Sequence, residues 1–319
     1  ANYRNYNEPH YGISDYMQLA MRALPVMTPY LADGSYGRSW VVTPGQNTFG
    51  NMLACKDGEN NYKQTRIVSS AFAEYVFPYD IKYNVTLGIR KVDLTRRYFQ
   101  PATYTYNPKT LEPQKMIANT TAMNTANDDI NPSISQTINW SHKFNGKHDI
   151  SALLGMNYEE FNAWSFSARG QDGYLDNELT EVGLATTFLK PSSSSSKVRL
   201  LSYFGRLNYD YADRYLFEMN LRYDGSSRFA KKHRWGLFPS FSAGWRIDQE
   251  HFMENAQNWL SNLKMRVSWG QLGNQSIGLF QYTPVMNSGV NYIFGNVPAT
   301  GYAVTQAADP KISWETTTI

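Results

Sequence analysis

The stretch RYLFEMNLRYDGSSRF, residues 214–229, alternates in polarity over its first ten residues. Tyr215, Phe217, Met219, Leu221 and Tyr223 are apolar or aromatic, and most of the residues between them are polar. A period of two places the two sets of side chains on opposite faces of a β-strand. The strand leads into Asp-Gly-Ser-Ser, and a second alternating run begins soon afterwards.

Similar alternation recurs along most of the chain. It is clearest at residues 82–90, 149–158, 203–211, 237–247 and 263–270. Further strands are expected near 67–77, 132–143 and 311–319, which makes about nine strands in all.

The connections between these strands alternate in length. Tight turns are expected near Pro78-Tyr79-Asp80, Asn145-Gly146 and Ala212-Asp213, and Asn-Gly between alternating runs is a strong hairpin signal. Long polar connections are expected at 98–131, 164–197 and 275–311. The serine run 192–196 is interpreted as a flexible loop tip, because it offers no apolar surface to bury. Two connections depart from the pattern: 230–234 is short, and 248–261 is long with a helical turn near 251–260.

Composition narrows the class of protein. The chain has 319 residues, 15% aromatic residues and a mean hydropathy of −0.51, with no apolar stretch long enough for a transmembrane helix. The net charge of +3 is too small and too dispersed to indicate nucleic acid as a partner. Cys55 cannot form an internal disulfide and is interpreted as a bystander thiol. The first residues do not form a signal peptide, so we expect a processed chain or an internal part of a longer one.

Two fold classes fit these features: soluble all-β proteins and outer-membrane barrels. Outer-membrane barrels have short periplasmic turns and long extracellular loops, whereas a soluble sandwich has no reason to sort its loops by length. The loop pattern therefore favours the membrane barrel.

An ordered series of motifs resembles the barrel of the SusC/RagA family of TonB-linked outer-membrane transporters. The series is DGSSRF, RWGLFPSFSAGWR, LSNLK and SWGQLGNQ within residues 202–278, and ISWETTT at 312–318 also fits. Residues 21–37 fit more weakly. The resemblance implies an all-β fold: an antiparallel up-and-down transmembrane β-barrel, here partial, with residues 1–319 forming about nine strands of a larger plugged barrel of about 22 strands.

The same resemblance implies a function and partners. Members import nutrients such as oligosaccharides or peptides across the outer membrane of Gram-negative bacteria. They work with a SusD-like surface lipoprotein and with TonB, which grips a region ahead of the plug. The plug and that region are not recognisable in residues 1–319, so this chain is expected to be part of a longer transporter.

Three groups of residues are candidates for functional roles. The rim-turn motif is expected to be structural and comprises Asp224, Gly225, Ser226, Ser227, Arg228 and Phe229. In that interpretation Asp224-Gly225 ends the strand pairing, with glycine allowing a positive φ. The candidates for the lumen face are Arg206, Asn220, Arg222, Arg246, Lys264 and Arg266. The aromatic residues that could stack on a ligand are Tyr104, Tyr106, Tyr282, Tyr292 and Phe294.

No catalytic, cofactor or metal motif was found, and we expect the protein not to be an enzyme. The sequence has no HExxH, P-loop or GxGxxG pattern. The oxygen-rich stretch NTANDDIN (124–131) lacks EF-hand spacing and is interpreted as a solvated loop rather than a Ca²⁺ site. Two alternatives to active import remain: a passive porin, and a soluble carbohydrate-binding or hydrolytic β protein with paired carboxylates in a cleft.

Overall fold

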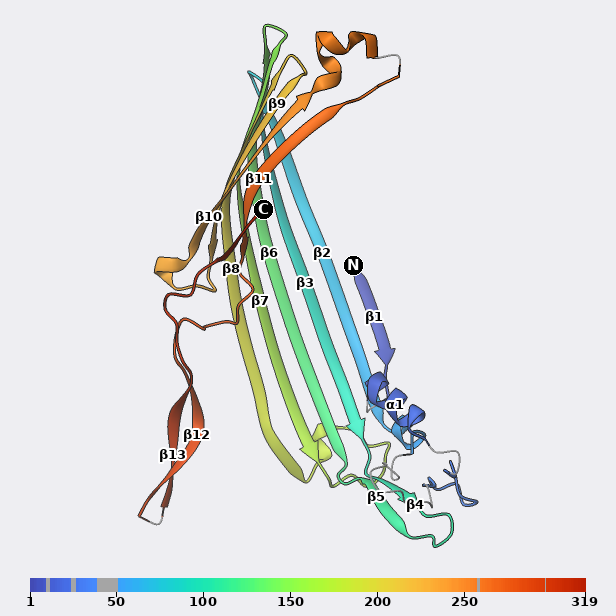
Figure 1. The fold of residues 1–319 in the computed structure, drawn as a ribbon. Helices are drawn as coiled ribbons and strands as arrows, with labels where there is room; N and C mark the ends of the chain where they lie inside the picture. The colour runs from blue at the N-terminus through green and yellow to red at the C-terminus, as the bar shows by residue number, and fades with distance from the viewer. Residues whose placement is uncertain (10–11, 24–26, 39–50, 257–258, 296) are drawn as a thin grey trace. The chain divides into compact units, whose positions relative to one another are not determined.

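The computed structural model describes residues 1–9, 12–23, 27–38, 51–256, 259–295 and 297–319. Ten strands form one sheet in the order β1-β2-β3-β6-β7-β8-β9-β10-β11-β14, which follows the chain (Figure 1). Their bounds are β1 Asn2–Asn7, β2 Glu59–Phe77, β3 Ile81–Gln100, β6 Thr121–Phe144, β7 His148–Gln171, β8 Thr187–Tyr211, β9 Tyr215–Ser226, β10 Trp235–Arg246, β11 Lys264–Asn274 and β14 Glu315–Thr318. The predicted all-β, sequentially paired architecture of a partial barrel is confirmed.

Smaller elements lie in the connections. Two separate hairpins are formed by β4 with β5 and by β12 with β13. The bounds are β4 Thr103–Tyr106, β5 Pro113–Ile117, β12 Val285–Phe294, β13 Val297–Gln306, α1 Gly12–Met21, η1 Ala54–Lys56, η2 Val182–Leu184, η3 Lys231–His233, η4 Ile247–Gln249 and η5 His251–Ala256. No helix among the described residues is long and apolar enough to cross a membrane.

Three hairpins close with the tight turns that the sequence predicts. Tyr79-Asp80, Asn145-Gly146 and Ala212-Asp213 each have two consecutive positive φ values, between 48° and 67°. Two such residues in a row are characteristic of a type I′ turn, whose twist matches that of the flanking strands. The turns therefore join β2 to β3, β6 to β7 and β8 to β9 directly.

The predicted long connections were wrong over much of their length, because the strands continue into them. β6 and β7 each have 24 residues and β8 has 25, so residues 124–131 and the serines at 192–196 are strand residues. A tilted strand needs only about 9–11 residues to cross the hydrocarbon layer. Outside that layer the side chains do not meet lipid, so they need not alternate in polarity.

Other boundaries also changed. The connections expected at 98–131 and 275–311 contain the β4–β5 and β12–β13 hairpins, and the final strand spans Glu315–Thr318, with Ile319 also bonded to the Gly270 backbone. The helical turn expected near 251–260 is present as η5, His251–Ala256, whereas residues 257–258 lie outside the described residues. Residues 24–26 of the weaker motif at 21–37 also lie outside them.

The chain divides into two compact units, and the divisions fall within long strands. Unit 1 contains residues 1–68, 90–130 and 162–196, and unit 2 contains residues 69–89, 131–161 and 197–319. Unit 1 buries Cys55 and Phe99, and the Phe99 ring packs edge-on against Tyr174 with ring centroids 5.3 Å apart. Unit 2 buries Phe229 and Phe238. Unit 2 holds the ordered motifs within residues 202–278 and the ISWETTT motif, and unit 1 holds the weaker motif at 21–37.

Candidate polar wall and rim turn

Strands β8 to β11 carry one apolar face and one polar face in unit 2. Cross-strand pairing aligns the apolar side chains in rows. From one end to the other, the rows are Tyr211–Tyr215–Trp245–Met265, Tyr209–Phe217–Ala243–Val267, Leu207–Met219–Phe241–Trp269, Gly205–Leu221–Pro239 and Tyr203–Tyr223–Leu237. Most of these large side chains are exposed, so the face needs an apolar surrounding.

Aromatic side chains lie at both ends of the apolar face. The Trp235 indole stacks on Tyr223, with ring centroids 4.7 Å apart, and lies 6.1 Å from Tyr203. At the other end, Trp245 pairs across the strands with Tyr215. Paired aromatic belts of this kind mark the two interfaces of a membrane barrel.

All six candidates for the lumen face lie on the opposite face of the sheet. Pairing aligns Arg206 with Asn220, Arg246 with Lys264, and Gly244 with Arg266. Their even positions on paired strands put them, with Arg222, on the face opposite Leu221. The six side chains therefore share one face, while their orientation toward a lumen remains a prediction.

Hydrogen bonds link the polar side chains along β9 and between β9 and β8. Arg206 Nε donates to Asn220 Oδ1 at 2.8 Å, and Asn220 Nδ2 donates to Glu218 Oε1 at 2.7 Å. Arg222 Nε donates to both carboxylate oxygens of Asp224 at 2.8 Å, and its Nη2 donates to Ser202 at 3.0 Å. Such charge-assisted bonds hold long side chains in fixed positions on this polar face.

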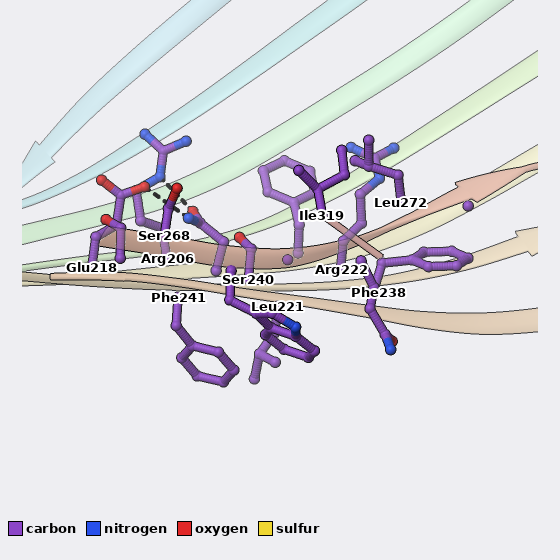
Figure 2. A pocket seen from close by; sticks show the side chains of 18 of the residues that line it. Arg206, Glu218, Leu221, Arg222, Phe238, Ser240, Phe241, Ser268, Leu272 and Ile319 are labelled. Atoms are coloured by element: carbon purple, nitrogen blue, oxygen red, sulfur yellow. Dashed lines mark hydrogen bonds between the residues drawn. The ribbon is translucent and has the colours of Figure 1, made fainter. Parts of the chain in front are cut away.

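A hollow of about 660 Å³ lies over this polar face. Figure 2 shows Arg206, Glu218 and Ser240 on one side of the strands, with Leu221 and Phe241 on the other. The volume falls within the usual range for ligand sites. The lining combines guanidinium, carboxylate, amide and hydroxyl groups with the apolar side chains of Phe204, Phe238, Leu272 and Ile319, so it suits an occupant with both polar and apolar parts.

The rim turn does not end strand pairing where the sequence suggested. Asp224, Gly225 and Ser226 belong to β9; Asp224 and Gly225 pair with both β8 and β10, and Ser226 pairs with β8. Gly225 is not among the residues with positive φ. Its role is spatial, because a Cβ atom there would lie 2.8 Å from three ring atoms of Trp235. The glycine makes room for the indole that completes the aromatic belt.

This close approach predicts a stability effect. Gly225→Ala is expected to destabilise the barrel by about 1–3 kcal/mol, the usual cost of overpacking. Chemical unfolding in detergent micelles would measure it. Gly183→Ala is the control, because nothing lies within 4 Å of a Cβ there. Combining Gly225→Ala with Trp235→Leu should recover part of the loss, and equal effects of the two alanine variants would contradict the steric explanation.

The rest of the rim motif fastens the chain to a distant segment. Ser227 exchanges hydrogen bonds with Arg199, and Arg228 Nη1 donates to the carbonyl oxygen of Ile277 at 2.6 Å. Phe229 is fully buried, with its ring 5.4 Å from that of Trp314. These contacts suit the structural role expected for DGSSRF.

Trp314 was not singled out by sequence reasoning, although it lies within the ISWETTT motif. Its indole Nε1 donates to the Arg234 carbonyl oxygen at 2.9 Å, and its ring also packs against Phe238 at 5.3 Å. Only the tertiary contacts show that this residue ties β14 to the rim.

A second cluster was also missed. Glu160 on β7 is nine-tenths buried and accepts hydrogen bonds from Arg199 Nε at 2.7 Å and Tyr158 OH at 2.7 Å. Lys197 Nζ lies 2.8 Å from its other oxygen. The sequence around these residues did not predict the cluster, because its members come from two different strands.

The five loop aromatics are divided between the units. Tyr104 and Tyr106 lie on β4 in unit 1, where Lys115 Nζ is 5.8 Å from the centre of the Tyr104 ring. Tyr292 and Phe294 lie on β12 in unit 2, are exposed, and have ring centroids 4.9 Å apart. Tyr282 precedes that hairpin. Their role as a ligand surface remains a prediction.

No group of three His, Cys, Asp or Glu side chains placed to hold a metal ion was found in the part of the chain that the structure describes. The stretch 124–131, expected as a solvated loop, is instead part of β6.

Comparison with known proteins identifies the family. Residues 93–318 match the family described as TonB dependent receptor-like, beta-barrel. The chain belongs to this TonB-dependent receptor family. Within it, the relatives found are of the SusC/RagA type that the sequence motifs indicated.

Three similar proteins illustrate the relationship. The chain is 38% identical to the TonB-dependent receptor SusC of Bacteroides thetaiotaomicron over 180 residues, which cover 54% of this chain and 17% of SusC. It is 28% identical to TonB-dependent receptor P3 of Formosa agariphila over 315 residues, covering 96% and 29%. A structure of the RagAB peptide importer in its closed-closed state matches with a TM-score of 0.76 at 21% identity, covering 90% of this chain and 31% of that chain.

These findings place the strands of this chain in the outer membrane, which they cross as part of a barrel. The chain spans less than a third of the length of the proteins it matches.

Proposed function

We propose that this chain forms part of the barrel wall of a TonB-dependent importer of a nutrient such as an oligosaccharide or a peptide. The observation that carries the proposal is the two-faced register of β8 to β11, taken with the family match. An importer of polar nutrients needs a polar interior and an apolar exterior in the same strands, and these strands have both.

The spacing of the aromatic belts supports placement across a bilayer. Trp235 is the first residue of β10, and Trp245 is its last residue but one. Their separation is about 33 Å at roughly 3.3 Å per residue. A tilt of about 40° reduces this to about 25 Å across the membrane, the height of the apolar band of outer-membrane barrels.

In this proposal, the polar face lines the lumen. Arg206, Asn220 and Arg222 form its hydrogen-bonded part, and Arg246, Lys264 and Arg266 continue it toward the periplasmic end. The exposed rings of Tyr104, Tyr292 and Phe294 are candidates for stacking on a ligand outside the membrane.

The proposal includes two partners. A SusD-like surface lipoprotein would deliver the nutrient, and TonB would supply energy from the inner membrane through a region outside residues 1–319. A structure of RagAB describes a peptide importer, and SusC is named a TonB-dependent receptor, so both relatives suit this assignment.

Nutrient-limited growth tests the proposal. Cells producing the complete protein are supplied with single oligosaccharides or peptide mixtures, with and without TonB. We expect at least one nutrient whose uptake requires both the protein and TonB. Uptake that requires the protein but persists without TonB would instead indicate the passive porin. Extraction of the protein without detergent would indicate the soluble alternative.

A further inference from the structure

Tight turns join β2 to β3, β6 to β7 and β8 to β9 at one end of the sheet. The connection between β10 and β11 lies at the same end but is much longer. Its two ends are tied together, because the backbone N–H groups of Ile247 and Asp248 donate to the Leu263 carbonyl oxygen at 2.9 and 3.2 Å. The segment between them therefore forms a closed loop that contains η5. In barrels of this kind, such short-turn ends face the periplasm.

Glu250 places this loop beside the apolar face. One carboxylate oxygen accepts hydrogen bonds from the Tyr215 hydroxyl at 2.7 Å and from the Trp245 indole N–H at 3.0 Å. Arg214 Nη1 lies 3.4 Å from the other oxygen. Tyr215 and Trp245 are cross-strand neighbours in the last row of the apolar face. Glu250 therefore holds its part of the loop against the face that meets lipid, whereas Asp248 at the start of the loop lies 4.0 Å from Arg246 of the polar face.

The loop also carries two large side chains without cover. Phe252 is 68% exposed and Trp259 is 77% exposed. In the adjacent apolar row, Met265 is 54% exposed and Tyr215 is 47% exposed. Tryptophan is enriched where the membrane meets water, because its ring is apolar and its N–H group is polar.

We propose that the β10–β11 loop is an interfacial anchor whose Phe252 and Trp259 side chains insert into the inner leaflet of the outer membrane. The loop continues the lipid-facing surface of the strands, which identifies lipid rather than a second protein as the occupant. Residues 247–263 contain no Lys or Arg. Insertion is therefore driven by apolar contact, and it does not require anionic headgroups. Glu250 holds the loop at this depth.

Depth-dependent quenching tests the anchor. In a Cys55→Ser background, the complete protein receives a single cysteine at position 252, 254 or 259, labelled with nitrobenzoxadiazole. The labelled proteins are reconstituted in phosphatidylethanolamine vesicles with lipids brominated at carbons 6 and 7. Labels replacing Phe252 and Trp259 should be quenched at least twofold more than the label replacing Glu254. The result should not change between low and high salt.

Other outcomes would overturn the proposal. Equally weak quenching at all three positions would show that the loop lies in water, and equally strong quenching would contradict selective insertion of Phe252 and Trp259. Protection of positions 252 and 259 from aqueous iodide without quenching by brominated lipid would show that protein covers them. Glu250→Ala should reduce quenching at position 259 in barrels that remain folded by heat-modifiable gel mobility. Unchanged quenching in that variant would overturn the positioning role of Glu250.

Discussion

Leu221→Arg is expected to prevent most of the protein from assembling in the outer membrane. Leu221 lies in a central row of the apolar face, between Gly205 and Pro239 on the neighbouring strands. An arginine at the lipid face near the bilayer midplane costs roughly 2–4 kcal/mol. The heat-modifiable, folded fraction in isolated outer membranes measures the effect, and we expect it to fall severalfold.

Asn220→Arg is the matched control for this prediction. Asn220 precedes Leu221 in the chain but lies on the polar face, hydrogen-bonded to Arg206 and Glu218. An arginine there can pair with the Glu218 carboxylate and remain hydrated, so assembly should stay near the wild-type level. Equal tolerance of both substitutions would contradict the assignment of the two faces, and loss of assembly in both would contradict the polar environment of Asn220.

Phe229→Ala should cause the largest loss of stability among substitutions in the rim turn. The side chain is fully buried and packs against Trp314, whose indole also contacts Phe238 and the Arg234 carbonyl. Truncating a buried phenylalanine costs about 3–5 kcal/mol, because transfer energy is lost and a cavity remains. Urea unfolding in micelles would give the free energy of unfolding.

Limited proteolysis adds a local measurement to this prediction. Residues 275–314 should become more susceptible in Phe229→Ala, because Trp314 loses its packing partner. Phe241→Ala is the control: Phe241 is 37% exposed on the apolar face, where detergent can fill the space left by the ring. If both variants lose the same stability and residues 275–314 stay protected, Phe229 does not fasten that segment.

Much of the candidate site followed from local pattern. The alternation in β8 to β11 predicted which side chains share a face, because a strand has a strict period of two. Asn145-Gly146 predicted a hairpin, because both of its residues readily adopt positive φ. Pattern was misleading for the serines at 192–196, which lie in β8. β9 pairs with β8 only from Leu200 onward, so β7 is the strand next to these serines, and no local signal carries that information.

The sequence by itself determined the strand faces, the tight turns and, through its motifs, the family. Tertiary structure decided the roles that depend on residues far apart in the chain. The absence of a side chain at Gly225 leaves room for the Trp235 ring. Phe229 packs against Trp314 at the rim. At the other end, Glu250 accepts hydrogen bonds from Tyr215 and Trp245. A period of two is a local property of the backbone, whereas these contacts arise only when pairing brings separate strands into register.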